Sequence, residues 1–521
     1  MPPMTRRRNR RQNSVCGIGR QCPPEAFSQS FLASGGHCLS ILLVAFLLVG
    51  AVSCRPTAGM ELQNFAQSAH PSQPDGWAPP VHIATGGYGF AAPSLLSADG
   101  KRVTGWMMGT SRLYPLEFAP LPSPPAGYKP VYITHYGRHG SRYLVNPGQY
   151  VAVNSILEKA AADSMLTLEG QRIWQTYSDV YPLLDKREGE LTPLGAIQHR
   201  GIARRMVGRY PSLFKKNARI EANSTNLERT MLSMFYFTRE LLSLRPGLDI
   251  HADASRSYMG VINQHTLENP RATEYDVQWK KGDGLWRPAF DAYVADIIDP
   301  KPFCKRLFAD YDYLRGLCDP LDFERTFFDV AMNFPSCGFP NILDAFTSNE
   351  LLLLGRLDNC SFYIGKSRFP GGDKRGCYLS EAVLGDIIDR VEPDIESGVR
   401  VRLRFGHDGC MMALLAMLKV DGWGAELEDF SRSWEVWDVS QIPMAANLQL
   451  VFFRGRRGDL IFLPLLNEQP LSLPLESIGG AYYSWERFVT YCEPILREAR
   501  EALSVPPVPV VIPYLGETPV K

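Results

Sequence analysis

Alternation of apolar and charged positions is clearest in the C-terminal part of the chain. Residues 399–405 alternate strictly between apolar side chains and arginines, which predicts a β-strand with one face turned away from the core. The run 411–418 is apolar throughout and predicts a buried helix. Two further apolar runs, 448–454 and 460–466, flank a Gly-Arg-Arg-Gly turn and predict a β-hairpin.

The middle of the chain has helical patterns interrupted by one short strand. Thr192 and Pro193 predict the start of a helix, because threonine is a good N-cap and proline fits the first helical position. Residues 219–222 predict a strand, and one of the polar residues 224–226 is expected to cap the helix that follows. Between about 255 and 395 the pattern is mostly helical and aromatic, which predicts an α-rich inserted region.

A β-rich run at 131–134 follows a proline-rich approach and leads into a glycine-punctuated loop at 135–140. A strand that runs into a loop and then a helix is typical of open α/β sheets, in which ligands bind at the carboxyl ends of strands. We therefore expect an α/β fold with a central, mainly parallel sheet flanked by helices. The folded domain is expected over 130–503, between a Pro/Gly-rich extension at 55–129 and a proline-rich tail at 504–521.

The first 54 residues have the features of a targeting segment. They contain six arginines and one acidic residue, and an apolar run at 39–49 ends on small residues, which predicts a signal peptide. The Ala-Val-Ser-Cys sequence at 51–54 resembles a bacterial lipobox, which implies a lipid on Cys54, export to the cell envelope and anchoring to the membrane. An uncleaved anchor helix is the alternative, since the apolar run is near the lower limit for spanning a bilayer.

Charge and cysteine usage exclude two classes of function. The chain has 55 basic and 55 acidic residues, so the body after residue 54 is mildly acidic, which argues against sequence-independent nucleic-acid binding. The cysteines number 11 and include no CxxC pair, which excludes a zinc ribbon and a thioredoxin motif. Seven of them follow residue 54; export permits disulfides among these, and the odd number leaves at least one unpaired.

The segment that carries chemistry is Arg-His-Gly-Ser-Arg at 138–142. The transition state of phosphoryl transfer spreads negative charge over three oxygens, and planar guanidinium groups match these with paired hydrogen bonds. A histidine held between two arginines can attack phosphorus and form a covalent phosphohistidine. The spacing of Arg138, His139 and Arg142 on a turn after a strand therefore suits a phosphate site, with Gly140 leaving space beside the backbone.

This motif resembles the signature of the histidine acid phosphatases, a family that includes phytases and multiple inositol polyphosphate phosphatases. Three later segments are similar to the family in the same order: residues 190–199 resemble the helix opening after the signature, 226–230 the segment of a third phosphate-binding arginine, and 406–408 the distal His-Asp pair. The resemblance covers roughly residues 125 to 500. The inositol polyphosphate branch generally has a His-Ala-Glu triplet where this chain has His-Asp-Gly.

The resemblance implies a role for each site residue. His139 would be the nucleophile, and Asp408 would donate a proton to the departing alcohol, which needs a raised pKa that burial or a nearby phosphate would supply. The phosphoryl oxygens would be bound by Arg138, Arg142, Arg229 and His407. No metal and no organic cofactor are implied. The expected activity is hydrolysis of small organic phosphates, with inositol polyphosphates as one class and sugar or glycerate phosphates as the alternative.

Other interpretations of these residues remain open. Arg229 suits a surface ion pair with a neighbouring glutamate, and His407 with Asp408 suits a capping pair before the apolar helix. His135 is either a residue at the rim of the substrate site or a histidine at the end of a strand. With His139 it has the spacing of a zinc-binding pair, and a metallohydrolase is therefore a further alternative. A surface lipoprotein that binds phosphorylated ligands without turnover is the alternative from another class.

Overall fold

The computed structural model describes residues 95–263, 270, 274, 286–372 and 374–505. Contacts divide the chain into two units, Met1–Trp77 and Ala78–Lys521, and every described residue belongs to the second. The predicted signal segment, Cys54 and the proline-rich tail from residue 506 lie outside the described residues. Within the described ranges, no helix has the length and apolar character needed to span a bilayer.

A single mixed sheet forms the centre of the described unit. Its strands are, in spatial order, β3 (Asp249–Asp253), β2 (Arg219–Ser224), β4 (Val399–Gly406), β1 (Lys129–Arg138), β5 (Asn447–Arg454), β6 (Leu460–Leu466) and β7 (Gln469–Pro470), with β8 (Tyr483–Ser484) also pairing with β6. The β3-β2-β4-β1 half is parallel, whereas the remaining strands are antiparallel. The predicted α/β fold and the hairpin at β5–β6 are confirmed, and the sheet is mixed because that hairpin joins it antiparallel to β1.

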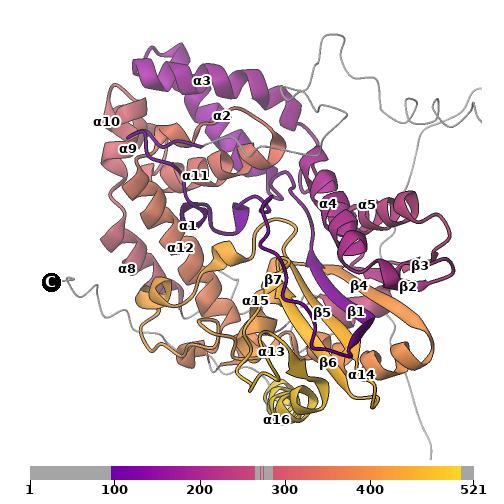
Figure 1. Ribbon diagram of the computed structural model, residues 1–521. Coiled ribbons are helices and arrows are strands. Elements are labelled where there is room, and N and C mark those ends of the chain that lie inside the picture. Colours follow the sequence, from indigo (N-terminus) through magenta and orange to yellow (C-terminus); the bar gives the residue numbers. More distant parts are fainter. Residues whose placement is uncertain (1–94, 264–269, 271–273, 275–285, 373, 506–521) are drawn as a thin grey trace, which may run out of the picture. The chain divides into compact units, whose positions relative to one another are not determined.

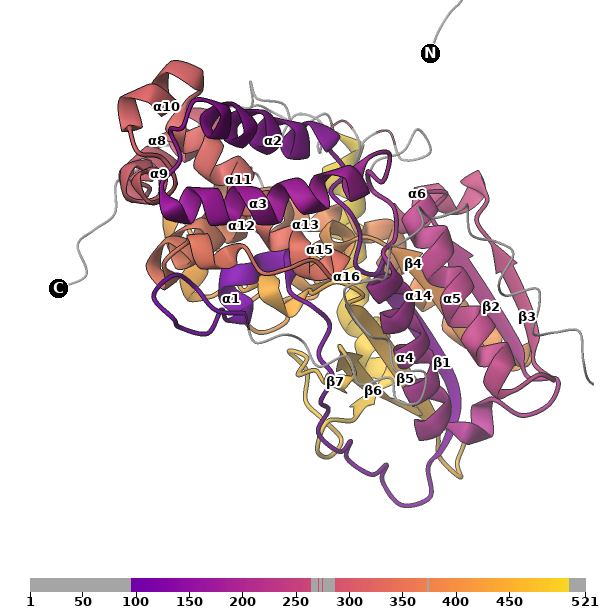
Figure 2. The same cartoon turned by 90° about the horizontal axis from the view of Figure 1, so that it is seen from above.

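Helices cover both faces of the sheet (Figure 2). One face packs on α4 (Pro193–Arg209) and α5 (Glu228–Leu244), through apolar residues such as Leu403 and Phe405. The opposite face packs on α14 (Glu381–Glu396), α15 (Asp408–Met417) and α16 (Trp485–Ser504). As predicted, Thr192 caps α4, since its side chain accepts a hydrogen bond from the Gly195 amide. The cap predicted for α5 is wrong: its N-cap residue is Leu227, which makes no side-chain hydrogen bond.

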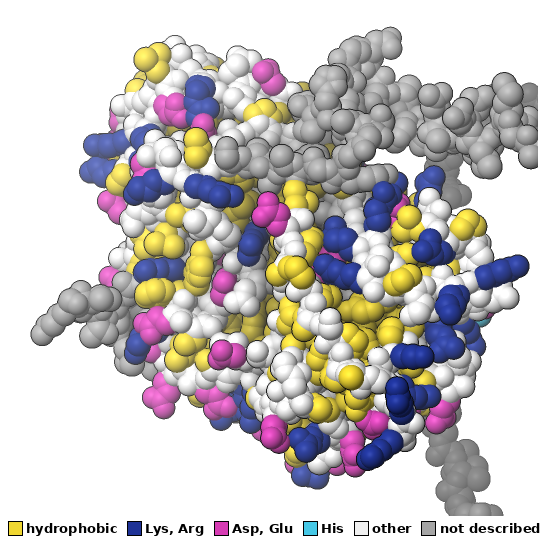
Figure 3. All heavy atoms as spheres, in the orientation of Figure 1, with side chains coloured by type: hydrophobic (Ala, Val, Ile, Leu, Met, Phe, Trp, Pro, Cys, Tyr) yellow, Lys and Arg dark blue, Asp and Glu magenta, His cyan; other side chains and the backbone are white. Residues whose placement is uncertain are grey.

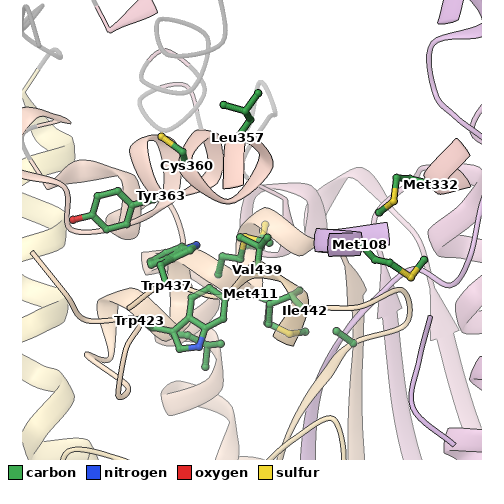
Figure 4. Close-up of a cluster of buried hydrophobic side chains, with 14 of the residues drawn as sticks. Met108, Met332, Leu357, Cys360, Tyr363, Met411, Trp423, Trp437, Val439 and Ile442 are labelled. Carbon is green, nitrogen blue, oxygen red and sulfur yellow. The ribbon is translucent and has the colours of Figure 1, made fainter. Parts of the chain in front are cut away.

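A helical region stands beside the sheet (Figure 1). It contains α1 (Gly105–Met108), α2 (Pro147–Ala162), α3 (Leu168–Val180), α8 (Arg287–Ile297), α9 (Pro300–Leu307), α10 (Tyr311–Leu317), α11 (Pro320–Cys337), α12 (Ser348–Lys366) and α13 (Arg375–Tyr378). Helix α6 (Met259–Ile262) instead packs on α14 and β4 (Figure 2). The α-rich character predicted for residues 255–395 is confirmed over the described part of that range. Figure 4 shows part of the apolar core that α12 and α15 share, where Trp423 and Trp437 lie beside Met411. The two tryptophan rings have centroids 4.6 Å apart.

The arginine face of β4 is partly covered, although an outward-facing strand side was expected. Arg404 is 1% exposed, and its Nε donates to Asp386 of α14 at 2.7 Å. Arg402 donates through Nη2 to Asp394 of the same helix at 2.7 Å. The alternating pattern thus predicted the strand correctly, but α14 covers this face at Arg402 and Arg404, to each of which it supplies a carboxylate, while Arg400 stays exposed.

The stretch before β1 contributes to the core. Leu95, Val103, Met108 and Tyr114 are buried, and the Tyr114 hydroxyl donates to Glu468 at 3.0 Å. Glu468 is fully buried, and Arg205 and Arg209 of α4 each donate to it at 2.7 Å. The described part of the predicted extension is therefore tied to α4 and to the residue that follows β6. Figure 3 shows lysine and arginine side chains gathered over α4 and α5 on this face.

The seven cysteines that follow residue 54 all lie in the described residues, and all are free thiols. Five of them are buried, among them Cys304, Cys360 and Cys410. The apolar core therefore holds this unit together without disulfides among the described residues.

Candidate active site

Strand register places the two sequence motifs side by side. Strands β1 and β4 are parallel neighbours, with Arg138 at the end of β1 opposite Gly406 at the end of β4. The His139 amide donates to the Gly406 carbonyl at 3.1 Å, and His407 and Asp408 follow at the start of α15. Because parallel strands end at the same edge, residues 138–142 and 407–408 meet there.

Two helices hold the loop after β1. The Gly140 amide donates to Ser233 of α5 at 3.1 Å, and Ser233 donates to the carbonyl of Arg229 one turn earlier at 2.7 Å. A Cβ on Gly140 would lie 2.6 Å from the Cα of Gly195 in α4, so only glycine allows this approach. The loop is thus fixed against the first turns of α4 and α5, and α5 carries Arg229 to it.

The site is a cluster of cations around a neutral imidazole. Burial, followed by the charges of Arg138, Arg142, Arg229 and His407, holds the pKa of His139 well below its usual value. The rings of His139 and His407 have centroids 5.7 Å apart. We call His139 and these four cationic residues the arginine pocket. Neutral imidazole keeps the lone pair that a nucleophile needs.

Hydrogen bonding fixes which nitrogen of His139 carries the lone pair. Its Nδ1 lies 2.9 Å from the Gly140 carbonyl oxygen, which can only accept, so Nδ1 carries the hydrogen. The lone pair is then on Nε2. A neutral ring in this tautomer can attack an electrophile through Nε2.

Backbone carbonyls hold Arg138 in place, and the three arginines also have Nε donors without a partner among the described residues. Arg138 is 1% exposed and donates through Nη1 to the carbonyls of Thr110 at 2.6 Å and Ile442 at 2.9 Å. The Nε atoms of Arg138, Arg142 and Arg229 are buried and have no hydrogen-bond partner among the described residues. Buried unpaired donors are unfavourable unless a ligand accepts from them. An oxyanion such as a phosphoryl group fits this set of donors.

Asp408 is an ionised partner of Arg138. Its Oδ2 lies 2.7 Å from Arg138 Nη2. Burial raises the pKa of Asp408, but the charges of Arg138 and His407 outweigh it and hold that pKa at about 2. Asp408 therefore does not have the raised pKa expected for a proton donor, because the guanidinium group favours the carboxylate.

The structure brings together Arg138, His139, Arg142, Arg229, His407 and Asp408, the predicted site residues apart from His135 and Cys54. The rim position considered for His135 is wrong, since that residue is 2% exposed and packs against Phe237 and Phe405 in the sheet core. Burial lowers the pKa of His135 to about 3. No group of residues suited to hold a metal ion occurs in the described part of the chain.

Two residues at the site, Thr225 and Asp358, were not predicted as site residues from the sequence. Thr225, considered only as a helix cap, places its Oγ1 3.3 Å from His407 Nε2. The Asp358 carboxyl group of α12 accepts from the Thr110 amide at 3.4 Å, next to the Thr110 carbonyl that Arg138 contacts. Asp358 lies in an ordinary helical stretch without a motif, so only the tertiary packing of α12 on residues 105–111 reveals its position.

A family model described as the histidine phosphatase superfamily (branch 2) matches residues 137–462, which include the whole arginine pocket. The chain belongs to this superfamily. A search of curated protein sequences found no match. The assignment agrees with the resemblance found in the sequence motifs.

Solved structures show the same fold at low sequence identity. The multiple inositol polyphosphate phosphatase of Bifidobacterium longum, in complex with inositol hexasulfate, aligns with a TM-score of 0.56 and 16% identity, over 73% of this chain and 95% of that one. The phytase of D. castellii aligns with a TM-score of 0.58 and 14% identity, over 78% of this chain and 89% of that one. These similarities establish the histidine phosphatase fold for this chain.

Proposed function

We propose that this histidine phosphatase superfamily member hydrolyses small organic phosphomonoesters through a phosphohistidine at His139. The observation that carries the proposal is the arginine pocket, in which guanidinium groups surround a neutral imidazole with its Nε2 lone pair available. In this reaction Nε2 forms a bond to phosphorus as the bond to the leaving alcohol oxygen breaks. Water then attacks phosphorus and releases inorganic phosphate and the free histidine.

Arg138, Arg142, Arg229 and His407 are proposed to bind the phosphoryl oxygens. Their charges already act on His139, and the buried Nε donors of the three arginines point to recognition of an oxyanion. Negative charge on the oxygens increases as the transition state forms, so these donors stabilise it more than the ground state.

Asp408 is proposed to become the proton donor only when substrate is bound. In the ligand-free site, Arg138 keeps its carboxylate ionised. A phosphoryl group that takes the Arg138 hydrogen bonds and brings negative charge next to Asp408 raises the pKa of that carboxyl group. The carboxyl group can then protonate the leaving oxygen.

Trapping the intermediate tests the proposed activity. Mixing the protein with a 32P-labelled phosphomonoester and quenching in alkali should leave acid-labile label on His139. His139→Ala should abolish both label and turnover. A protein that binds phosphorylated ligands without turnover would give no label and no alcohol, and activity lost to chelators would instead support a metallohydrolase.

Two classes of phosphomonoester are candidate substrates. The similar solved structures include a multiple inositol polyphosphate phosphatase and a phytase, which supports inositol polyphosphates as one candidate class. Sugar or glycerate phosphates are the other class, because the arginine pocket by itself recognises only the phosphoryl group. A panel of both classes on the purified protein separates them.

Export and lipidation at Cys54 stay predictions from the sequence. The lipobox-like residues 51–54 support them, and Cys54 lies outside the described residues. Metabolic labelling with radioactive palmitate, compared with Cys54→Ala, is the test. Label on the wild-type chain alone would support lipidation.

A further inference from the structure

The buried hydroxyl group of Tyr136 contacts the segment that carries His407 and Asp408. Tyr136 lies on β1, two residues before Arg138, and is 1% exposed. Its hydroxyl oxygen accepts a hydrogen bond from the His407 amide at 3.2 Å, and the hydroxyl donates to the Ile262 carbonyl of α6 at 3.2 Å. These two hydrogen bonds use the hydroxyl both as acceptor and as donor, so its position is fixed from both sides.

Glycine at the end of β4 makes room for this hydroxyl group. A Cβ on Gly406 would overlap the Tyr136 hydroxyl oxygen and would lie 2.9 Å from the Ile262 carbonyl oxygen. Any larger residue at 406 would therefore displace the hydroxyl group from the amide that it contacts. The contact is thus built where β1 and β4 run into the two site motifs.

Helix α6 joins this contact to the segment before α5, the helix that carries Arg229. Its last residue, Ile262, accepts from the Tyr136 hydroxyl. Its first residue, Met259, accepts through its sulfur from the Asn226 amide at 3.3 Å, two residues before α5 begins. One short helix is therefore in contact with the segment before α5 and, through Tyr136, with the start of α15.

The backbone at His407 sets the direction of two side chains of the site. His407 is the N-cap residue of α15, with a φ of −132° and a ψ of 162°, and an N-cap amide has no partner within its helix. Asp408, the first residue of that helix, accepts from the Gly409 amide at 2.7 Å and pairs with Arg138 at 2.7 Å. Tyr136 supplies an acceptor for the His407 amide, so it holds the backbone from which the imidazole ring and the carboxyl group project.

We propose that Tyr136 is a positioning residue, whose hydroxyl group holds His407 and Asp408 in the geometry needed to protonate the leaving alcohol. This inference rests on the proposed phosphatase activity and on the role proposed for Asp408. Proton transfer requires the acid to lie within hydrogen-bond reach of the leaving oxygen, whereas attack by His139 on an activated ester does not. Loss of the Tyr136 hydroxyl should therefore slow esters of alkyl alcohols more than esters of acidic phenols.

The test is Tyr136→Phe, which removes one oxygen atom and keeps the buried ring. Its kcat for glycerol 2-phosphate should fall by about tenfold, because a small displacement of the acid is costly for proton transfer. Its kcat for 4-nitrophenyl phosphate, whose leaving group needs no proton, should fall by less than about threefold. The ratio of the two kcat values is the measurement.

Tyr132→Phe is the matched control. Tyr132 lies four residues earlier on the same strand, in the same apolar core, and is fully buried. Its hydroxyl donates to Asp394 of α14 at 2.7 Å rather than to a residue next to the arginine pocket. The control therefore loses the same atom from a similar hydrogen bond, and it should lower the melting temperature while leaving the kcat ratio at its wild-type value.

A second background shows whether Tyr136 acts through Asp408. Two residues that act through one group have non-additive effects, so Tyr136→Phe should not change the kcat ratio further in the Asp408→Asn variant. A further change in that background would reject the inference, as would an unchanged ratio in Tyr136→Phe or an equal shift in Tyr132→Phe. Failure of the phosphatase proposal looks different, because wild type would then hydrolyse neither ester.

Discussion

The two sides of the site differ in charge and in how the fold builds them. The sheet side consists of residues at the ends of β1 and β4 and in the first turn of α5, and it is cationic. The helical side contributes the carboxyl group of Asp358 from α12, which accepts from the Thr110 amide. Phosphoryl recognition thus depends on strand register, which tolerates little change. The helical side depends on helix packing, and it also helps to hold the arginine pocket, since the Thr110 carbonyl accepts from Arg138 and Asn333 of α11 donates to the Arg142 carbonyl.

Removal of the nucleophile should give the largest effect on the sheet side. His139→Ala should lower kcat by at least about a thousandfold, because no other group in the pocket replaces the attacking nitrogen. The measurement is steady-state turnover of 4-nitrophenyl phosphate. His251→Ala, on the edge strand β3 and 52% exposed, is the matched control and should keep full activity. Equal losses in both variants would contradict the assignment.

Asp408→Asn should separate phosphoryl binding from proton transfer. We expect a loss of about a hundredfold for alkyl phosphates and a much smaller loss for 4-nitrophenyl phosphate, whose leaving group needs no proton. The pKa of Asp408 is about 2 in the free site and must rise on binding for the carboxyl group to act as the acid. In wild type, kcat for alkyl phosphates should therefore fall as pH increases through the raised pKa, and the variant should lack this decline. Equal slowing of both substrates would remove the assignment.

Arg229→Lys tests whether the fork of the guanidinium group is needed beyond its charge. Lysine keeps the positive charge but loses the paired donors, so kcat/KM should fall by about tenfold to thirtyfold. The measurement is kcat/KM for a single phosphomonoester, from stopped assays of released inorganic phosphate. Arg239→Lys, exposed on the same helix, is the control. Unchanged activity in Arg229→Lys would show that charge alone acts at this position.

The variant with the smallest expected effect on activity tests the stability of the helical side. Glu324 of α11 is 1% exposed, its Oε2 has no partner among the described residues, and burial raises the pKa of its carboxyl group to about 8. A raised pKa means that the folded state holds the proton more tightly, so stability is lost as pH rises from about 4.5 to about 8. Urea unfolding should show that the loss of stability with rising pH is steeper in wild type than in Glu324→Gln, by on the order of 1 kcal/mol per pH unit. If the free energy of unfolding changed with pH in the same way in wild type and in Glu324→Gln, the prediction would be contradicted.

Features that depend on neighbouring residues in the sequence were predicted correctly. Alternation, capping and turn chemistry predicted β4, the start of α4 and the β5–β6 hairpin, and the motifs at 138–142 and 406–408 located the sheet side of the site. The mixed character of the sheet was missed, because strand direction depends on which edge the hairpin joins.

Prediction failed where packing between distant segments decides. The α5 N-cap is Leu227, since Thr225 turns instead to His407, and His135 is enclosed by aromatic rings rather than placed at a rim. Asp358 gave no local signal at all, because its position follows from the packing of α12 on α1. The low pKa of Asp408 likewise follows from a guanidinium group distant in sequence.

The buried Glu468 has a practical consequence for shortening the chain. Its hydrogen bond from Tyr114 joins a residue before the first strand to one that follows β6. A truncated chain that began at the strand itself would lose buried apolar side chains such as Val103 and Met108, expose the core residues that they cover to water, and remove one of three donors to a buried carboxylate. Expression boundaries for biochemical work should therefore lie upstream of Leu95, so that the leading segment folds together with the rest.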